Sequence, residues 1–324
     1  MSNSKNIVFL YSGSHVPDII AESAKSKVPD GFSLIFCENK TADAERRAAL
    51  AKADYVMAYA VGFEDFDVVG QARLFQLLSA GYDRFDLAAF AKLGLPVATN
   101  GGANAPTVAE HALLLILAVY KKLGMHDRTM RAGEWVGMRE ALSMRELRGK
   151  QVGIVGFGKI GRLLAEMVGG FRTKVVYYDV QAAPAEVERA LNARRVELDE
   201  LMETSDVISL HTPLNDATRG LIGAQTLARM KSTAIIINTG RGPVVDEAAL
   251  YEGLRDGAIA GAGLDVFESE PLAADSPLLT LDNIVVTPHI AGTTLDTWTR
   301  RLDFAFGNFQ RVDGGAGAEF LIQA

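Results

Sequence analysis

Short, almost wholly apolar runs alternate with helical stretches in the second half of this chain, and this alternation limits its fold more than any other feature. The runs are QVGIV from residue 151, KVVYYD from 174, DVISLH from 206, AIIINTG from 234, AIAGAGLDV from 258 and NIVVTPH from 283. A strand with one face in water would alternate apolar and polar residues, whereas these runs are nearly continuous. They therefore predict a parallel sheet that is covered by helices on both faces.

A second series of the same kind lies between residues 6 and 99. Its strand-like runs are NIVFLY, FSLIFCE, YVMAYA, RLFQLLS and LPVAT. Because 324 residues are enough for two domains, we expect two α/β domains. We place them at residues 1–101 joined by residues 293–324, and at residues 102–292, since the helical pattern that follows residue 292 is expected to return to the first domain.

The segment that joins the two series is apolar around most of its helical circumference. It covers residues 108–133, and its most apolar part, residues 112–120, is too short to span a bilayer. A helix of this kind is expected to be buried between domains or between subunits.

The charge balance limits the partners of the chain. The formal net charge is −7 and the pI is near 5.4. Nucleic acid and anionic membranes need concentrated Lys and Arg, so we expect neither as a partner, and a small molecule instead. The single cysteine, Cys37, lies in an apolar run, which predicts a buried thiol and no internal disulfide. With no export signal at the N-terminus, this favours a cytoplasmic location.

A glycine motif follows the first run of the second series. It reads G-x-G-x-x-G and consists of Gly156, Gly158 and Gly161, with Lys159 and Ile160 at the start of the next helix. In a dinucleotide site the first glycine permits the tight turn, the second lets a pyrophosphate approach the backbone, and the third lets the helix pack on the strand. Amide groups at the helix start then face the phosphates. An ordinary strand-to-helix turn is the alternative.

An acidic residue stands where such a site needs one. Asp179 ends the run KVVYYD, and residues 180–183 carry no cation. A carboxylate there accepts hydrogen bonds from the adenosine ribose and repels the extra phosphate of NADP, so the pattern predicts NAD. The alternative is that Asp179 caps the next helix.

Three polar side chains follow three successive runs. Arg241 comes after AIIINTG, Glu270 after AIAGAGLDVFES and His289 after NIVVTP. If the runs are neighbouring parallel strands, their carboxyl ends open on one crevice. Arginine can bind a carboxylate with two hydrogen bonds and histidine can move a proton near neutral pH, so the trio suits acid/base chemistry on an anionic carbonyl compound. Taken singly, each residue could instead anchor a loop, lie in a solvated turn or fill the core.

The other histidines are scattered along the chain. His15, His111, His126 and His211 lack the spacing of a zinc site with other His, Cys or carboxylate residues. We expect no metal.

Several motifs together resemble one known family. They are GFGKIG with Asp179, HTPLNDATRGLI, INTGRGPVVDEAAL, AGLDVFESEP and TPHIAG, in this order. This set is similar to the D-isomer-specific 2-hydroxyacid dehydrogenases. The resemblance implies two doubly wound parallel-sheet domains, namely a flavodoxin-like substrate domain and an inserted Rossmann domain that binds NAD. It also implies a homodimer formed through the 108–123 helix and the segment around Trp135.

Carried over position by position, the resemblance implies roles for the trio. Arg241 would bind the carboxylate and the carbonyl oxygen of the substrate. His289 would donate the proton when a 2-oxo acid is reduced, and Glu270 would be its carboxylate partner. Hydride would pass between the nicotinamide and the carbon that bears the oxygen.

The resemblance also implies further contacts. Those with the cofactor would come from His211, Thr212, Pro213, Thr239, Gly240 and Asp265. Those with the substrate would come from the backbone amides of Ala80 and Gly81, with Asn104 nearby. His211 could equally be a strand-end residue and Asp265 a buried carboxylate that bonds backbone amides, while Gly81 could be a simple turn and Asn104 a helix cap.

The substrate is expected to be small and unphosphorylated. Some relatives carry an extra cation in the first domain for a phosphate group, whereas the corresponding stretch here, AYAVGFED, is apolar and then acidic. Glyoxylate and hydroxypyruvate are the candidates. The alternatives are an NAD-sensing binding protein similar to the corepressors of this family, and a dehydrogenase of another small anion such as formate or phosphite.

Overall fold

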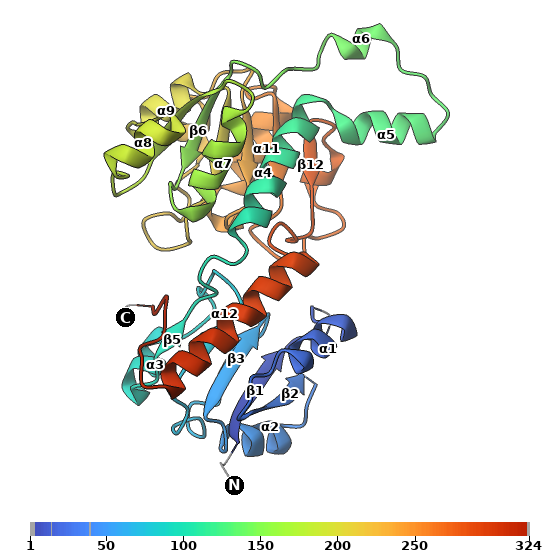
Figure 1. Cartoon of the computed structure of the whole chain (residues 1–324). Helices are drawn as coiled ribbons and strands as arrows, with labels where there is room; N and C mark the ends of the chain where they lie inside the picture. Colours follow the sequence, from blue (N-terminus) through green and yellow to red (C-terminus); the bar gives the residue numbers. More distant parts are fainter. Residues whose placement is uncertain (1–3, 14, 39, 323–324) are drawn as a thin grey trace. The chain divides into compact units, whose positions relative to one another are not determined.

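The computed structural model describes residues 4–13, 15–38 and 40–322. It consists of two compact units (Figure 1). One unit ends at Asn104 and resumes at Thr293, and the other runs from Ala105 to Gly292. The division at Asn104 falls directly before a long helix, α4.

The first unit is built on a five-stranded sheet in which every pair of neighbours is parallel. Its order is β2-β1-β3-β4-β5, which is the flavodoxin-like order. The strands are β1 (Lys5–Tyr11), β2 (Phe32–Glu38), β3 (Tyr55–Tyr59), β4 (Phe75–Leu77) and β5 (Val97–Ala98). All five runs predicted from the sequence form strands of this sheet.

Helices cover both faces of this sheet. They are α1 (Asp18–Ser26), α2 (Asp43–Leu50), α3 (Leu87–Leu93) and α12 (Leu295–Asp313). On one face, Trp298, Phe306 and Phe309 of α12 pack with Phe9 and Tyr55 of the sheet, and α1 joins the same core. On the other face, α2 and α3 pack in a second core. The terminal helix therefore belongs to the first unit, although the second unit precedes it in the chain.

The second unit is built on a seven-stranded parallel sheet. Its order is β12-β11-β10-β9-β6-β7-β8, which is the Rossmann order with a seventh strand added. The strands are β6 (Gln151–Val155), β7 (Lys174–Tyr178), β8 (Ala193–Arg195), β9 (Val207–Leu210), β10 (Ile235–Asn238), β11 (Gly261–Leu264) and β12 (Ile284–Val286). The predicted α/β class with two doubly wound sheets is confirmed.

One strand of this sheet has no apolar run in the sequence. Strand β8 reads ARR, and both arginines are exposed because β8 lies at the edge of the sheet. An edge strand is buried on one side at most, so its sequence lacks the signal that marks the central strands.

The helices of this unit are α4 (Ala105–Tyr120), α5 (Leu123–Arg131), α6 (Met138–Ala141), α7 (Lys159–Gly169), α8 (Ala185–Leu191), α9 (Leu198–Thr204), α10 (Ala224–Leu227) and α11 (Glu247–Arg255). Two short 3-10 helices span Gly242–Val244 and Pro277–Thr280. No helix among the described residues is long and apolar enough to cross a membrane.

The single helix expected over residues 108–133 is two helices. Lys122 adopts a left-handed backbone conformation with φ +50°, which ends α4 and starts α5. Helix α4 packs on the sheet at Gly263, where an added Cβ would lie 2.9 Å from the Cβ of Leu115. Helix α5 has no buried residue. Within one chain the buried residues of this segment lie on α4, whose packing is on the sheet of its own unit, and α5 and α6 extend from it as an arm, residues 123–142 (Figure 1).

Candidate active site

The glycine motif forms the turn between β6 and α7. Gly156 has φ +93°, and a Cβ there would lie 2.8 Å from the backbone of His211. At Gly161 a Cβ would lie 2.4 Å from the carbonyl oxygen of Gly156. Around Gly158, by contrast, an added Cβ would meet nothing within 4 Å. Two glycines are thus needed by the packing of the protein, and the third leaves room for a ligand at the start of an 11-residue helix.

The carboxylate of Asp179 lies against this turn. Its Oδ2 accepts a hydrogen bond of 2.7 Å from the backbone N–H of Phe157, and its Oδ1 accepts one of 3.1 Å from Gln181. Helix α8 begins six residues later with Pro184 as its N-cap, so Asp179 does not cap it. The position beside the glycine turn is the one that a ribose-binding carboxylate requires.

A cation that the sequence analysis missed lies beside Asp179. Arg195, at the end of β8, donates hydrogen bonds of 3.2 and 2.9 Å from Nε and Nη2 to the backbone oxygen of Asp179. The local stretch after Asp179 carries no cation, but the neighbouring strand supplies one. Only the strand order brings Arg195 there, and β8 gave no sequence signal.

The loops after β9 and β10 complete this part of the site. His211 Nε2 lies 2.9 Å from Ser209 Oγ, and its Nδ1 lies 3.4 Å from Thr239 Oγ1. Burial lowers the pKa of His211 to about 4, so the ring is uncharged at neutral pH. Its side chain bridges Ser209 and Thr239 at the strand ends, and a contact of this residue with the cofactor stays a prediction.

The hydroxyl of Thr212 fits a ligand at the glycine turn. Its Oγ1 is buried and has no hydrogen-bond partner among the described residues. The backbone N of Thr212 is within 2.9 Å of a Cβ placed on Gly156. A buried polar atom without a partner is costly, and a bound dinucleotide would supply one. Pro213 and Gly240 lie close by, since a Cβ on Gly240 would be 3.2 Å from the carbonyl oxygen of Thr212.

The structure places the polar trio after three adjacent strands. Strands β10, β11 and β12 are neighbours in parallel register, with Ile235 beside Gly261 and Ala262 beside Ile284. Arg241, Glu270 and His289 follow these strands in turn. The predicted convergence of the three strand ends is therefore observed.

Glu270 and His289 are in direct contact. His289 Nδ1 lies 2.7 Å from Glu270 Oε2, and Glu270 Oε1 accepts a hydrogen bond of 3.2 Å from the N–H of Phe267. A carboxylate only accepts hydrogen bonds, so Nδ1 of His289 is the donor and Nε2 points away from the pair. The side chain of His289 is 44% exposed and that of Glu270 22%, which leaves the imidazole accessible to a small molecule.

The loop of Arg241 packs on the segment that leads to Glu270. A Cβ on Gly242 would lie 1.9 Å from the carbonyl of Phe267, so only glycine permits this approach. The guanidinium of Arg241 donates a 2.8 Å hydrogen bond from Nη1 to the backbone oxygen of Gly240. The half-buried guanidinium is thus held at the end of β10.

Asp265 makes the backbone hydrogen bonds of one of the two roles that the sequence left open, and its contact with the cofactor stays a prediction. It is fully buried, and its carboxylate accepts hydrogen bonds of 2.9 and 2.8 Å from the backbone N–H groups of Ile290 and Ala291. It thereby ties β11 to the loop that carries His289.

The remaining predicted residues belong to the first unit. Ala80 and Gly81 follow β4, and the hydroxyl of Ser79 donates a 2.8 Å hydrogen bond to the backbone oxygen of Gly81. Asn104 accepts a 3.1 Å hydrogen bond from the side chain of Asn100.

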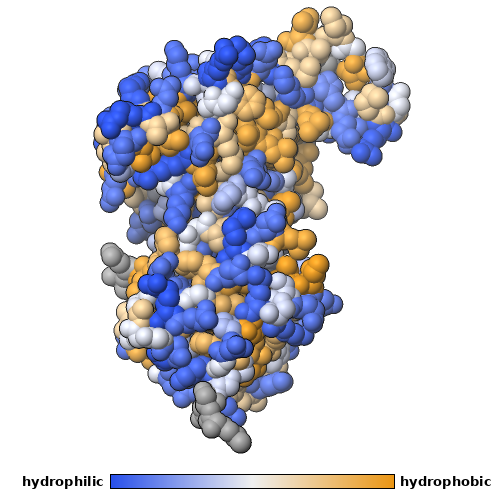
Figure 2. Space-filling view, in the orientation of Figure 1, coloured by the Kyte–Doolittle hydropathy of each residue, from blue (hydrophilic) through white to orange (hydrophobic). Residues whose placement is uncertain are grey.

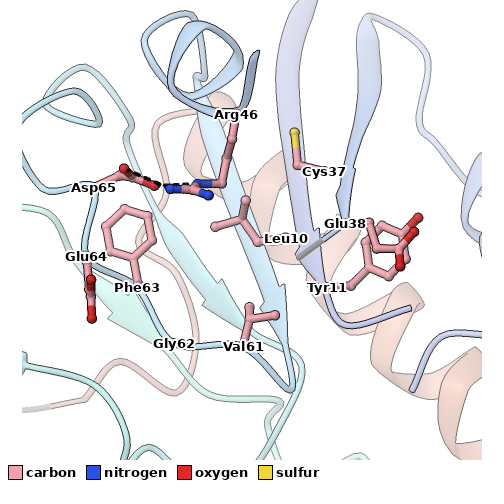
Figure 3. A pocket seen from close by; sticks show the side chains of 10 residues that line it. All are labelled: Leu10, Tyr11, Cys37, Glu38, Arg46, Val61, Gly62, Phe63, Glu64 and Asp65. Atoms are coloured by element: carbon pink, nitrogen blue, oxygen red, sulfur yellow. Dashed lines mark hydrogen bonds and ion pairs between the residues drawn. The ribbon is translucent and has the colours of Figure 1, made fainter. Parts of the chain in front are cut away.

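The first unit also has a cavity of about 320 Å³ near the carboxyl ends of β1 and β2 (Figure 3). Apolar side chains such as Leu10, Val61 and Phe63 line it together with Glu38, Glu64 and Asp65. The only cation in this described lining is Arg46, whose Nε donates a 2.7 Å hydrogen bond to Asp65 Oδ2. No group of three or more His, Cys, Asp or Glu residues suited to a metal occurs in the described part of the chain.

Comparisons with known proteins agree with this geometry. A family model described as "D-isomer specific 2-hydroxyacid dehydrogenase, NAD binding domain" matches residues 113–291. The chain is 39% identical over 247 residues to a glyoxylate reductase of Korarchaeum cryptofilum, which covers 76% of this chain and 74% of that protein. It is 41% identical over 222 residues to a hydroxypyruvate reductase of Thermotoga maritima, which covers 68% of this chain and 71% of that protein.

A solved structure shares the fold over the whole chain. The holo form of D-mandelate dehydrogenase from Rhodotorula graminis superposes with a TM-score of 0.87 at 28% identity, covering 99% of this chain and 98% of that one.

Proposed function

The chain belongs to the D-isomer-specific 2-hydroxyacid dehydrogenases, enzymes that exchange a hydride between NAD(H) and 2-hydroxy or 2-oxo acids, and we propose that here the His289–Glu270 pair moves the proton. The observation that carries the proposal is the 2.7 Å contact that fixes Nδ1 of His289 as a donor to Glu270. Because that nitrogen is occupied, Nε2 is the atom that meets the substrate.

Each residue has a defined part in reduction of a 2-oxo acid. NADH, when bound in the unit that spans residues 105–292, supplies the hydride to the carbonyl carbon. The electron pair of the C=O π bond moves to the oxygen, and this oxygen takes the proton from Nε2 of His289. Arg241 binds the carboxylate with its guanidinium fork, and Glu270 stabilises the positive charge of the imidazole before transfer. The backbone amides of Ala80 and Gly81, in the unit formed by residues 1–104 and 293–324, keep their predicted role as donors to a substrate carboxylate.

We assign the cofactor contacts to the residues around the glycine turn. Gly158, Lys159 and Ile160 would face the phosphates, Asp179 would bind the ribose, and Thr212 would provide a hydroxyl partner. His211, Pro213, Thr239 and Asp265 follow β9, β10 and β11 and would complete the cofactor contacts. These assignments rest on the open space at Gly158 and on the unpaired hydroxyl of Thr212.

An NADH oxidation assay tests the proposed function. We expect turnover with glyoxylate and hydroxypyruvate, and much less oxidation of 3-phosphoglycerate by NAD, because the one cation among the described residues that line the cavity of Figure 3 is already paired with Asp65. Formate and phosphite serve as controls for other anions. The proposal is wrong if no 2-oxo acid on the panel is reduced, or if the phosphorylated acid is the best substrate.

The replacement Asp179→Ser should reverse part of the preference for NADH. Like charges placed together cost several kcal/mol, so removing the carboxylate should raise kcat/KM for NADPH by about 10²-fold. Arg195 then lies ready to meet the extra phosphate, and Arg195→Ala added to Asp179→Ser should abolish much of this gain. If the ratio of kcat/KM for the two cofactors stays unchanged in Asp179→Ser, this role of Asp179 is refuted.

The exposed side chains of the arm support a homodimer. Trp135 is 86% exposed and Met138 79%, and Leu123, Met130 and Leu142 are exposed beside them. Figure 2 shows several of the apolar atoms on the projecting segment. A set of large apolar side chains on a short arm is costly in water and is covered by a second copy in a dimer.

Light scattering at dilute concentration measures the dimer. We expect twice the chain mass for the wild type and a shift to monomer for the double replacement of Trp135 and Met138 by Glu. The matched control is Val180→Glu, an exposed apolar position outside the arm. A wild-type chain that is strictly monomeric contradicts the dimer.

A cytoplasmic location is supported by the chemistry of the single cysteine. Cys37 is a buried free thiol, and burial raises its pKa, which keeps it protonated and unreactive. Fractionation of expressing cells should recover the protein with cytoplasmic markers.

A further inference from the structure

A network of hydrogen bonds that the proposed chemistry does not use lies next to the His289 loop. The carboxylate of Asp265, already bonded to the loop amides of Ile290 and Ala291, also accepts a 2.6 Å hydrogen bond from the hydroxyl of Thr287. The same hydroxyl lies 3.0 Å from Nε2 of His111, which comes from α4. His111 and Thr287 are 176 positions apart in the chain.

The direction of each hydrogen bond in this network follows from which groups carry a proton to donate. A threonine hydroxyl has one proton, and Thr287 gives it to Asp265, whose carboxylate can only accept. The oxygen of Thr287 must therefore accept from His111, so Nε2 of His111 carries a proton. The side chain of His111 is 14% exposed and that of Asp265 1%, so water competes little for these bonds.

The backbone of His289 needs such support. Its φ is +53°, in the left-handed region that residues with a Cβ rarely adopt. Its N–H donates a 2.8 Å hydrogen bond to the backbone oxygen of Asp265. A strained conformation of this kind persists only where several neighbouring contacts hold it. In this loop those contacts come from both the backbone and the side chain of Asp265.

We propose that Thr287 and His111 are positioning residues that hold Asp265, and through it the His289 loop, in the geometry that lets His289 contact Glu270. This inference rests on the proposed function of His289. Neither residue touches the substrate in this scheme, and each acts through the carboxylate of Asp265. Replacing Thr287 or His111 should lower kcat more than it changes KM, because proton transfer depends on the orientation of the imidazole.

The replacement Thr287→Val tests the inference, with Thr287→Ser as its rescue. Valine keeps the shape and removes the hydroxyl, and loss of a partner that orients a reacting group lowers activity by roughly 10- to 100-fold. We expect kcat for 2-oxo acid reduction to fall by at least about tenfold with KM and the Kd for NADH nearly unchanged. Serine restores the hydroxyl, so kcat should return to within about threefold of the wild type. The matched control is Thr280→Val, which removes a hydroxyl bonded to Pro277 in a 3-10 helix of the same unit.

Variants at His111 keep the test decisive if Thr287→Val does not fold. His111→Gln retains an N–H donor and should keep most of kcat, whereas His111→Leu lacks a donor and should lose it with an unchanged Kd for NADH. Wild-type kcat in both His111→Leu and Thr287→Val would overturn the inference, as would equal losses in the serine and valine variants. If the wild type is active and His289→Ala loses turnover, the proposed function stands even when this inference fails. The inference and the proposed function can therefore fail separately.

Discussion

Replacing His289 by alanine should lower the turnover of 2-oxo acid reduction by roughly 10²- to 10⁴-fold, the contribution of a positioned general acid. His211, the imidazole that follows β9, does not replace it as the donor, because burial lowers its pKa to about 4 and it carries no spare proton at neutral pH. The Kd for NADH, measured by fluorescence titration, should not change, because the cofactor contacts are assigned to other loops.

The partner of His289 provides a graded test of the same pair. Glu270→Gln keeps an oxygen that can accept from Nδ1 but removes the negative charge, so we expect a smaller loss of turnover than in His289→Ala. Glu268→Gln, two residues earlier at an exposed position, is the matched control and should behave as the wild type. Full activity of His289→Ala in stopped-flow measurements would reject the mechanism.

Replacing Arg241 by alanine should have the second-largest effect on the enzyme after His289→Ala. This effect should appear in kcat/KM. A hydrogen bond to a charged group contributes about 1.5–3 kcal/mol, so loss of the guanidinium should lower kcat/KM by about 10- to 150-fold. Arg241→Lys should recover part of this loss, since an ammonium keeps the charge but lacks the planar fork that matches a carboxylate. Steady-state kinetics with glyoxylate and with pyruvate measure both variants.

A neutral substrate separates this role from a general effect on the site. Pyruvamide lacks the carboxylate, so Arg241→Ala should cost far less with pyruvamide than with pyruvate. Arg255→Ala is the control, because Arg255 forms an exposed ion pair with Asp256 on α11. An equal loss on the acid and the amide would show that Arg241 does not bind the carboxylate.

Much of the fold follows from local rules. Central strands of a parallel sheet are buried on both faces, so their runs stand out, and every run predicted in either half of the chain forms a strand. The geometry of the glycine motif can likewise be predicted from its residues, because only glycine tolerates the φ of Gly156 and the close packing at Gly161. The trio was visible because parallel strands of one sheet end on the same edge.

Other features have no local signal. The expected helix over residues 108–133 breaks at Lys122, and the pattern of apolar residues does not report a single left-handed residue. The edge strand β8 has no apolar run, so the cation Arg195 beside Asp179 could not be foreseen from the residues around Asp179. The hydrogen-bond partners of Asp265 and His211 also needed the coordinates, since the type of residue does not fix them.

The sequence by itself determined the class of fold and the cofactor, and it predicted the reacting side chains, because each of these depends on residue types at fixed short spacings. The tertiary structure alone decided that Nδ1 of His289 contacts Glu270 and that Thr287 contacts both Asp265 and His111. Those answers depend on pairs such as His289 with Glu270 and His111 with Thr287, which strand order and helix packing bring together from distant positions. Hydrogen-bond direction is a property of such pairs, and no spacing along the chain encodes it.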